Sequence, residues 1–451
     1  MVNANSEVIV IGAGISGLLA ARVLANSCET VTIIERDRLS QSGQVRPGVP
    51  QGSHIHGLLA RGHEAIEDLV PGFAEDLLAD GAASVEFLSE TRISYQGYTL
   101  LQSPADISMA FASRPFIESR IARKVLALPN VRLLDGHTVQ ALTATPHGDR
   151  ITGVQLATPD GERVKRPATL VVAALGKAGQ ALSWLDRLGY PRPKESRMRI
   201  DVGYASRHYQ LPADVLGKDR FFFDGPHADR PCGLMIGVQE NGTWIVTACG
   251  YGAHAPHRTG HSFHEVVARL APAGVAERLA ASPALDDIHT FGFPASTRRH
   301  YERISRMPEG LIAFGDAVCS YNPIYGIGMT SAALQAKALA STLEAGGRRL
   351  PQRFYRRAAP NITLLWTLSS TMDHLISEVP GRRPLHVQLV APFLKRLLAT
   401  AEYDPEMART VARVVTFAAP LPGLLHPRLL VRVLHNRHDA RENPVVGVRD
   451  D

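Results

Sequence analysis

The stretch EVIVIGAGISGLLAARVLANSCETVTIIERDR, residues 7–38, decides the fold. A short apolar run comes first and predicts a buried strand over 8–11. A glycine-rich turn follows, then a helix to about residue 26, and then a second apolar run that predicts a strand over 31–34. This order of strand, turn, helix and strand is the βαβ unit that binds dinucleotides.

Three glycines in the turn form the pattern G-x-G-x-x-G. Gly12 permits the tight turn, Gly14 lets the backbone approach a pyrophosphate, and Gly17 lets the helix pack closely on the strand. The helix N-terminus offers free N–H groups and the positive end of its dipole to the phosphates. Glu35 follows Gly17 by 18 residues, where a carboxylate can bind both ribose hydroxyls and disfavours a 2′-phosphate. The motif therefore predicts FAD or NAD without choosing between them.

A second motif, EGLIAFGDAVCSYNPIYGIGMTSAALQAKALASTLEAGG, residues 309–347, favours FAD. It predicts a strand over 311–314, a glycine-rich loop, and a helix of small residues over 330–345. It resembles the ribityl-binding Gly-Asp motif of the group A flavoprotein monooxygenases. That resemblance implies that Asp316 accepts a hydrogen bond from a ribityl hydroxyl. It also implies that the helix N-terminus and the loop lie against the flavin ring, and the loop residues concerned are Pro323, Gly326 and Gly328.

The resemblance extends to two further segments. RPGVPQGSHIHGLLARGHEAIEDLVPGF, residues 46–73, looks like the bacterial epoxidase branch, which includes squalene-epoxidase-like enzymes and the epoxidases of polyether biosynthesis. SRPFIESRIARKVL, residues 113–126, is similar to the helix whose arginine reaches the FAD pyrophosphate. By motif position Arg123 is the predicted arginine, and Arg114 is the second candidate.

The segment LVVAALGKAGQALSWLDRLG, residues 170–189, departs from the family's pattern. In the family, an acidic residue, a small hydroxylated residue, a glycine and a basic residue are associated with the FAD pyrophosphate and with NADPH entry. Here Ala173 replaces the acid and Leu175 replaces the hydroxyl, whereas Gly176 and Lys177 keep the turn and one positive charge. Either this loop has drifted in a working monooxygenase, or the flavin no longer needs a reductant.

Three functional hypotheses follow. Some FAD-binding cyclases of spirotetramate and spirotetronate antibiotic biosynthesis resemble these monooxygenases but form a decalin by intramolecular [4+2] cyclisation without net redox change. Because the acid is missing, we favour this hypothesis, in which FAD is structural and an apolar cavity folds a linear polyene. The second hypothesis is an NAD(P)H- and oxygen-dependent epoxidase or hydroxylase, and the third is a catalytically silent flavin-binding partner protein. Both enzyme hypotheses imply a large apolar polyketide or polyene as substrate.

The predicted fold class is α/β. A Rossmann-like FAD-binding domain of the glutathione-reductase type is interleaved with an antiparallel β-sheet substrate domain, and a helical region ends the chain. The predicted FAD domain takes 1–80, 111–185 and 291–348, the sheet domain takes 81–110 and 186–290, and the helical region is 349–451. Asn241-Gly242, between two strand-like runs, predicts a hairpin. Prolines at 360, 380, 384 and 392 are expected to punctuate the helices.

Candidate pocket aromatics are Tyr204, Trp244 and Trp366, although core packing explains each of them as well. His54 and His56 form H-x-H, but no further ligand stands at a recognisable spacing, so no metal site is predicted. A hydrogen-bonding role, a flavin-edge role or an ordinary structural role remains open for these histidines. In the helical region the polar candidates are Asp373 and His374, for which a helix cap or a surface position is the alternative.

Composition bounds the remaining possibilities. The chain has 451 residues, 45% of them apolar, which is enough for a large core. The net charge of +6 is spread over interleaved acids and bases, so no nucleic-acid partner is predicted. Four cysteines without C-x-x-C spacing favour a reducing cytoplasm. The N-terminus lacks a basic region before its apolar run, which disfavours a signal peptide, and no apolar run is long enough to span a membrane.

Overall fold

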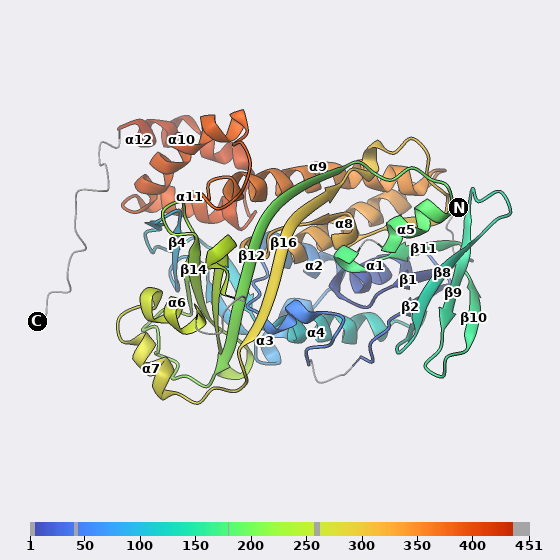
Figure 1. The fold of residues 1–451 in the computed structure, drawn as a ribbon, viewed down its shortest axis with the longest axis horizontal. Coiled ribbons are helices and arrows are strands. Elements are labelled where there is room, and N and C mark those ends of the chain that lie inside the picture. Colours follow the sequence, from blue (N-terminus) through green and yellow to red (C-terminus); the bar gives the residue numbers. More distant parts are fainter. Residues whose placement is uncertain (1–4, 40–43, 179, 257–261, 436–451) are drawn as a thin grey trace, which may run out of the picture.

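The computed structural model describes residues 5–39, 44–178, 180–256 and 262–435 (Figure 1). Two sheets organise this part of the chain, one parallel and one largely antiparallel, and helices of the C-terminal region cover one end of the second sheet.

The first sheet has five parallel strands in the order β17-β11-β1-β2-β7. These are β1 (Glu7–Ile11), β2 (Thr30–Ile34), β7 (Val131–Leu134), β11 (Leu170–Ala173) and β17 (Leu311–Ala313). The helices that pack on one another here are α1 (Ile15–Ala25), α4 (Arg114–Leu126) and α8 (Ile327–Glu344). Strands β1, β11 and β17 are continuous apolar runs, as expected for parallel strands that are covered on both faces; α1 packs against β1 and β2, and β9 (Ile151–Ala157) of a smaller sheet packs against β11. The strands and helices predicted from the two glycine-rich motifs are confirmed.

The second sheet has eight strands in the order β18-β16-β12-β15-β14-β13-β4-β5. They are β4 (Thr91–Tyr95), β5 (Tyr98–Thr99), β12 (Glu195–Tyr209), β13 (Phe221–Asp224), β14 (Cys232–Val238), β15 (Trp244–Tyr251), β16 (His289–Arg299) and β18 (Cys319–Ser320). All neighbours are antiparallel except β13 and β4. The predicted hairpin joins β14 to β15, and Asn241 and Gly242 take the positive φ angles of 58° and 70° that favour these residue types.

Smaller elements fill the connections. Strands β8 (Thr138–Ala144), β9 (Ile151–Ala157) and β10 (Arg163–Pro167) form a three-stranded sheet, and β3 (Ala83–Glu86) pairs with β6 (Ser108–Phe111). The remaining short helices are α2 (Ala60–Leu69), α3 (Phe73–Ala79), α5 (Gln180–Arg187), α6 (Ser262–Leu270) and α7 (Val275–Ala281).

The C-terminal region is helical, as predicted, with α9 (Leu350–Asp373), α10 (Leu385–Ala401), α11 (Pro405–Val415) and α12 (Pro427–His435). Helix α9 packs along α8, and the last three helices gather beside β4 and β14 in Figure 1. The prolines at 380 and 384 lie between α9 and α10. However, Pro360 and Pro392 lie inside helices, so the prediction that they separate helices was wrong.

The predicted fold class is confirmed. The domain boundaries stay predictions: β16 runs without a break through the boundary at 290/291, and residues 436–451 of the predicted helical region lie outside the described residues. Among the described helices, none is both long and apolar enough to cross a membrane.

Candidate functional site

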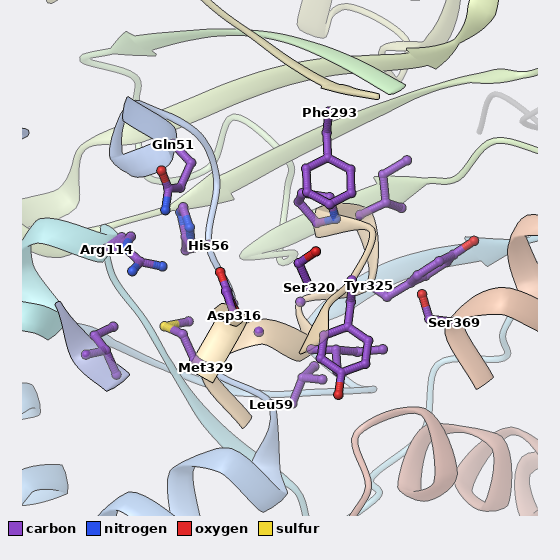
Figure 2. Close-up of a pocket in the computed structure, with 18 of the residues that line it drawn as sticks. Gln51, His56, Leu59, Arg114, Phe293, Asp316, Ser320, Tyr325, Met329 and Ser369 are labelled. Carbon is purple, nitrogen blue, oxygen red and sulfur yellow. The ribbon is translucent and has the colours of Figure 1, made fainter. Parts of the chain in front are cut away.

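A cavity of about 1050 Å³ runs from the glycine-rich turn to the C-terminal helices. This volume is at the upper end of the usual range for ligand pockets, about 300–1,000 Å³. Figure 2 shows Arg114, His56 and Asp316 on one side of it, and Ser320, Tyr325 and Ser369 on the other. The first side is charged. The second side continues into a wall of mostly apolar side chains, and the two are called the charged half and the apolar half below.

The glycine-rich turn lies at the charged end. Gly12 has a φ of +99°, and a Cβ added there would lie 2.5 Å from the carbonyl oxygen of Ala174. A Cβ on Gly17 would lie 1.8 Å from the carbonyl oxygen of Gly12, so only glycine lets α1 approach the turn. A Cβ on Gly14 would meet no atom closer than 3.8 Å. Gly12 and Gly14 line the cavity, whereas Gly17 acts through packing.

Glu35 lines the cavity at the end of β2 and is 6% exposed. Its carboxylate accepts a hydrogen bond from the backbone N–H of Ala13 at 2.7 Å, which ties it to the turn. Arg46 forms ion pairs with Glu35 at 3.0 Å, with Asp37 at 3.4 Å and with Glu118 at 2.7 Å. This edge of the cavity thus presents an arginine held by three carboxylates beside a helix N-terminus.

Helix α4 contributes Arg114 to the cavity, not Arg123. Arg114 lines the cavity, and its Nε is buried without a hydrogen-bond partner in the described residues. Arg123 is 53% exposed and forms ion pairs with Asp76 and Asp80 at 3.2 and 2.9 Å. The two arginines are nine residues apart, which is about two and a half turns, so they occupy opposite faces of the helix. This placement does not fit the pyrophosphate-binding role predicted for Arg123.

Asp316 follows β17 and lines the cavity with the loop residues Pro323, Gly326 and Gly328. Gly326 has a φ of +64° and caps the N-terminus of α8, so the free N–H groups of that helix start at the cavity wall. Burial raises the pKa of Asp316, while the charges of Arg114 and Lys177 act in the opposite direction. The elements that the sequence assigned to the ribityl chain and the flavin ring thus meet at one wall.

These residues fit a bound FAD. Gly14, which lines the cavity, is the N-cap of α1 and no side chain caps that end of the helix, so the first N–H groups of α1 begin beside the cavity, as a pyrophosphate requires. Glu35 and Asp316 place carboxylate acceptors at the two ends expected for a ribose and a ribityl chain. The buried Nε of Arg114 is a donor for which the described part of the chain offers no acceptor, and an anionic group would supply one.

The segment from Ala173 to Lys177, which departs from the family pattern, lies where the parallel sheet comes close to β16 of the large sheet. Ala173 is fully buried at the end of β11, between Ile11 and Ala313. Leu175 and Lys177 line the cavity. The Lys177 ammonium donates to the carbonyl oxygen of Ala295 at 2.6 Å and stands 3.7 Å from the centre of the Phe293 ring. Burial and, next, the charge of Arg197 lower the pKa of Lys177 to about 8.

The apolar half lies between the large sheet and the C-terminal helices. Its aromatic wall comes from alternate positions on β13 and β16, and the helices add aliphatic side chains. The lining residues here include Phe221, Phe223, Phe291, Phe293, Thr367, Leu368, Met372, Val390, Phe393, Leu394, Leu397, Val411, Val414 and Leu424.

Of the three predicted pocket aromatics, Tyr204 lines the cavity and the two tryptophans do not. Trp244 pairs with Tyr209, five positions from Tyr204, so it lies on the other face of the sheet and is 1% exposed. Trp366 is packed against the two hydrophobic cores. A period-two analysis of FFFD and HTFGF would have indicated the phenylalanines that do line the cavity.

A buried polar network joins the apolar wall to α9. Asp373 is 0% exposed, and its Oδ1 accepts hydrogen bonds from Asn322 at 2.6 Å, Tyr251 at 3.0 Å and Tyr325 at 3.0 Å. Its Oδ2 has no partner in the described residues. Tyr204 donates to Asn322 at 3.1 Å. Of the cavity-lining phenols, Tyr325 thus bonds directly to the Asp373 carboxyl group, and Tyr204 is linked to it through Asn322.

The other polar candidates are separate. His374 Nδ1 lies 2.6 Å from the carbonyl oxygen of Ser370, one turn earlier in the same helix. His54 and His56 both line the cavity, and His56 Nδ1 lies 2.9 Å from the carbonyl oxygen of His54. The described residues contain no group of three or more side chains suited to a metal ion.

Comparison with known proteins places this site in context. A family model described as FAD dependent oxidoreductase matches residues 7–182. Protein Rv3254 of Mycobacterium tuberculosis is 33% identical over 437 residues, 91% of this chain and 89% of that protein. Squalene monooxygenase SE1 of Panax ginseng is 31% identical over 177 residues, 38% of this chain and 30% of that protein.

Among solved structures, the Diels-Alderase PyrE3 in the biosynthetic pathway of pyrroindomycins matches with a TM-score of 0.61 at 18% identity, over 91% of this chain and 80% of that chain. At that identity the match shows the fold alone. The FAD-binding prediction is confirmed at the level of cofactor and of a flavin-monooxygenase-type fold. The branch within that fold stays a prediction.

Proposed function

This chain belongs to the same protein family as mycobacterial Rv3254, and from that premise we propose that it is an FAD-binding cyclase of natural-product biosynthesis. The proposed reaction is an intramolecular [4+2] cyclisation of a large apolar polyene or polyketide that forms a decalin. Two carbon–carbon bonds form at the expense of two π bonds, and no proton or electron is exchanged.

The observation that carries this proposal is the segment from Ala173 to Lys177. Its buried alanine and its leucine offer no carboxylate or hydroxyl beside the turn, and its ammonium is bound to Ala295 and the Phe293 ring. NAD(P)H would therefore find neither the carboxylate nor the hydroxyl group that the family pattern provides. A cyclisation needs none of them, because it is accelerated by holding the chain in a reactive conformer.

We assign FAD to the charged half. The pyrophosphate would lie on the turn at Gly12 and Gly14, with Gly17 holding the helix close. Glu35 would bind the ribose and Asp316 the ribityl chain, while the loop containing Pro323, Gly326 and Gly328 would border the ring. Arg114 replaces Arg123 as the proposed pyrophosphate arginine, because Arg114 is the one that lines the cavity. The aromatic wall with Tyr204 would enclose the substrate and exclude water.

Two observations favour the monooxygenase alternative. The match to squalene monooxygenase SE1 spans 38% of this chain, and the cavity is continuous between the charged and apolar halves. Under this alternative, bound FAD reduced by NAD(P)H would supply oxygen-transfer chemistry. The residues of the apolar wall would then hold the alkene beside the flavin.

An anaerobic reduction experiment separates the two functions. The purified FAD-bound protein receives NADPH and then NADH without oxygen, with and without a linear substrate that carries a conjugated diene and an enone in one chain. We expect the visible flavin absorbance to persist while an isomeric product of unchanged mass accumulates. Prompt bleaching that accelerates with the substrate would overturn the cyclase proposal and support the monooxygenase.

A further inference from the structure

His54 lines the cavity and is hydrogen-bonded to a pair of buried hydroxyl groups. Its Nδ1 lies 2.8 Å from Ser206 Oγ, and Ser206 Oγ lies 2.7 Å from Thr247 Oγ1. Ser206 on β12 and Thr247 on β15 are directly opposite each other and are 0% exposed. The three side chains therefore form a short buried chain of hydrogen bonds that ends at the imidazole.

The direction of that chain follows from counting hydrogens. In the described residues Thr247 Oγ1 meets no hydrogen-bonding group other than Ser206 Oγ, so its hydrogen is used only if it points to Ser206. The hydrogen of Ser206 then points to His54 Nδ1, which accepts. In either direction one buried hydrogen lacks an acceptor among the described residues: the Thr247 hydroxyl hydrogen in the opposite direction, and the Nε2 hydrogen of His54 in this one. His54 lines the cavity whereas Ser206 and Thr247 do not, so a ligand can supply an acceptor only in the direction that ends at His54. The remaining imidazole hydrogen therefore lies on Nε2.

The imidazole is neutral at physiological pH. Burial and, next, the charges of the neighbouring His289 and His208 lower the pKa of His54 to about 4. Its Nε2 is buried and has no partner in the described residues. The rings of Tyr204 and Phe291 flank it at centroid distances of 6.0 and 5.8 Å. Because Nε2 is itself covered, a ligand reaches it only after side chains around it shift.

We propose that His54 is a catalytic residue that donates a hydrogen bond from Nε2 to a carbonyl oxygen of the substrate. This rests on the proposed function and narrows the substrate to an apolar chain that carries a carbonyl conjugated with the reacting alkene. A neutral, fixed donor in an apolar cavity polarises that carbonyl and accelerates addition of the diene. The aromatic rings around the imidazole exclude water that would otherwise occupy the donor.

Methyl retinoate, a polyene ester that forms no imine with Lys177, is a suitable probe. Its affinity for the FAD-bound protein and its ester carbonyl stretch, isolated by isotope-edited infrared difference, are measured together. His54→Asn keeps a polar group near the Nδ1 position but removes the distal donor, whereas His54→Gln keeps a donor near the Nε2 position. Ser206→Ala removes the donor that holds the hydrogen on Nε2, so that both neutral tautomers become populated and fewer molecules present a donor at Nε2. Equal FAD content identifies correctly folded variants.

We expect His54→Asn to weaken methyl retinoate binding about tenfold, as the loss of one buried hydrogen bond predicts. The carbonyl stretch should rise in His54→Asn and in Ser206→Ala but stay low in His54→Gln. Equal affinities and equal stretches in wild type, His54→Asn and Ser206→Ala would overturn the role of His54 while leaving the apolar cavity intact. A ligand-free shift of the flavin spectrum in His54→Asn would assign the donor to FAD and also overturn it. Failure of the wild type to bind the probe would overturn the apolar substrate class as well.

Discussion

Replacing Asp373 by asparagine tests the buried network that joins α9 to the cavity wall. The Asp373 side chain is 0% exposed, all three of its hydrogen bonds fall on Oδ1, and Oδ2 has no partner in the described residues. Burial raises the pKa of this carboxyl from 3.8 to about 6, although the donors Asn322, Tyr251 and Tyr325 oppose the rise. The folded protein therefore holds this proton in a range of pH where the unfolded chain has lost it.

The magnitude follows from linkage. A rise from 3.8 to about 6, at about 1.4 kcal/mol for each pH unit, lowers the free energy of unfolding by about 3 kcal/mol once both states are ionised. This destabilisation is absent below pH 3.8, grows as the pH rises towards 6, and is constant above it. Between pH 5 and pH 8 the destabilisation therefore increases by roughly 1 to 2 kcal/mol. Asp373→Asn removes the titrating group, so that the variant lacks this loss of stability.

The assay is denaturant unfolding of the FAD-bound protein at pH 5, 6, 7 and 8 in excess FAD. The new amide has no acceptor for its N–H₂ at the Oδ2 position, but that cost does not change with pH, so the slopes are compared rather than the absolute values. Other titrating groups are common to both proteins and cancel. The matched control is Asp214→Asn, at a carboxylate whose side chain is 76% exposed. Parallel curves for wild type and Asp373→Asn would refute the reasoning.

Three further predictions concern the charged half. Arg114→Ala should weaken FAD binding about 10- to 100-fold, because a charge-assisted hydrogen bond is lost. Arg123→Ala should leave FAD binding unchanged, because the ion pairs of Arg123 are exposed, and flavin fluorescence titration measures the affinity of both variants. Gly17→Ala should abolish retention of FAD and lower the melting temperature, whereas Gly423→Ala, whose Cβ meets nothing within 4 Å, should do neither. Ala173→Asp should leave NADPH oxidation at background and lower stability, because the carboxylate would be buried; a rise in oxidation would indicate a decayed monooxygenase.

The parts of the fold that could be predicted are those whose signal is local. The βαβ unit requires its glycines at fixed spacing. The physical reason at Gly17 is that a Cβ there would lie 1.8 Å from the carbonyl oxygen of Gly12. The Asn241-Gly242 hairpin likewise follows from the positive φ angles at its tip. Such features depend on a few neighbouring residues, so a single sequence is enough to find them.

The features that could not be predicted depend on which face of a helix or strand a side chain occupies, or on contacts between residues that are far apart in the chain. Arg114 and Arg123 lie on one predicted helix, and motif position alone did not decide which face of that helix meets the cavity. Trp244 and Tyr204 lie on adjacent strands, but their faces follow from a register that the sequence does not contain. The partners of Asp373 come from segments up to 122 residues away in the chain, so no local pattern could identify its network.

The distribution of charge along the cavity constrains the substrate whichever reaction the protein catalyses. The anionic cofactor requires cationic groups and backbone donors, and Arg46, Arg114 and the α1 N-terminus supply them at one end. At the other end the polar side chains of His54, Tyr204 and Tyr325 are neutral: His54 has a pKa of about 4, and the pKa values of Tyr204 and Tyr325 lie well above 10. A charged substrate would lose its hydration there, and the Lys177 ammonium beside this wall is already bound to the Ala295 carbonyl oxygen and the Phe293 ring, so binding of a charge is unfavourable. The apolar half therefore selects neutral molecules that bind by burial of apolar surface and a few neutral hydrogen bonds.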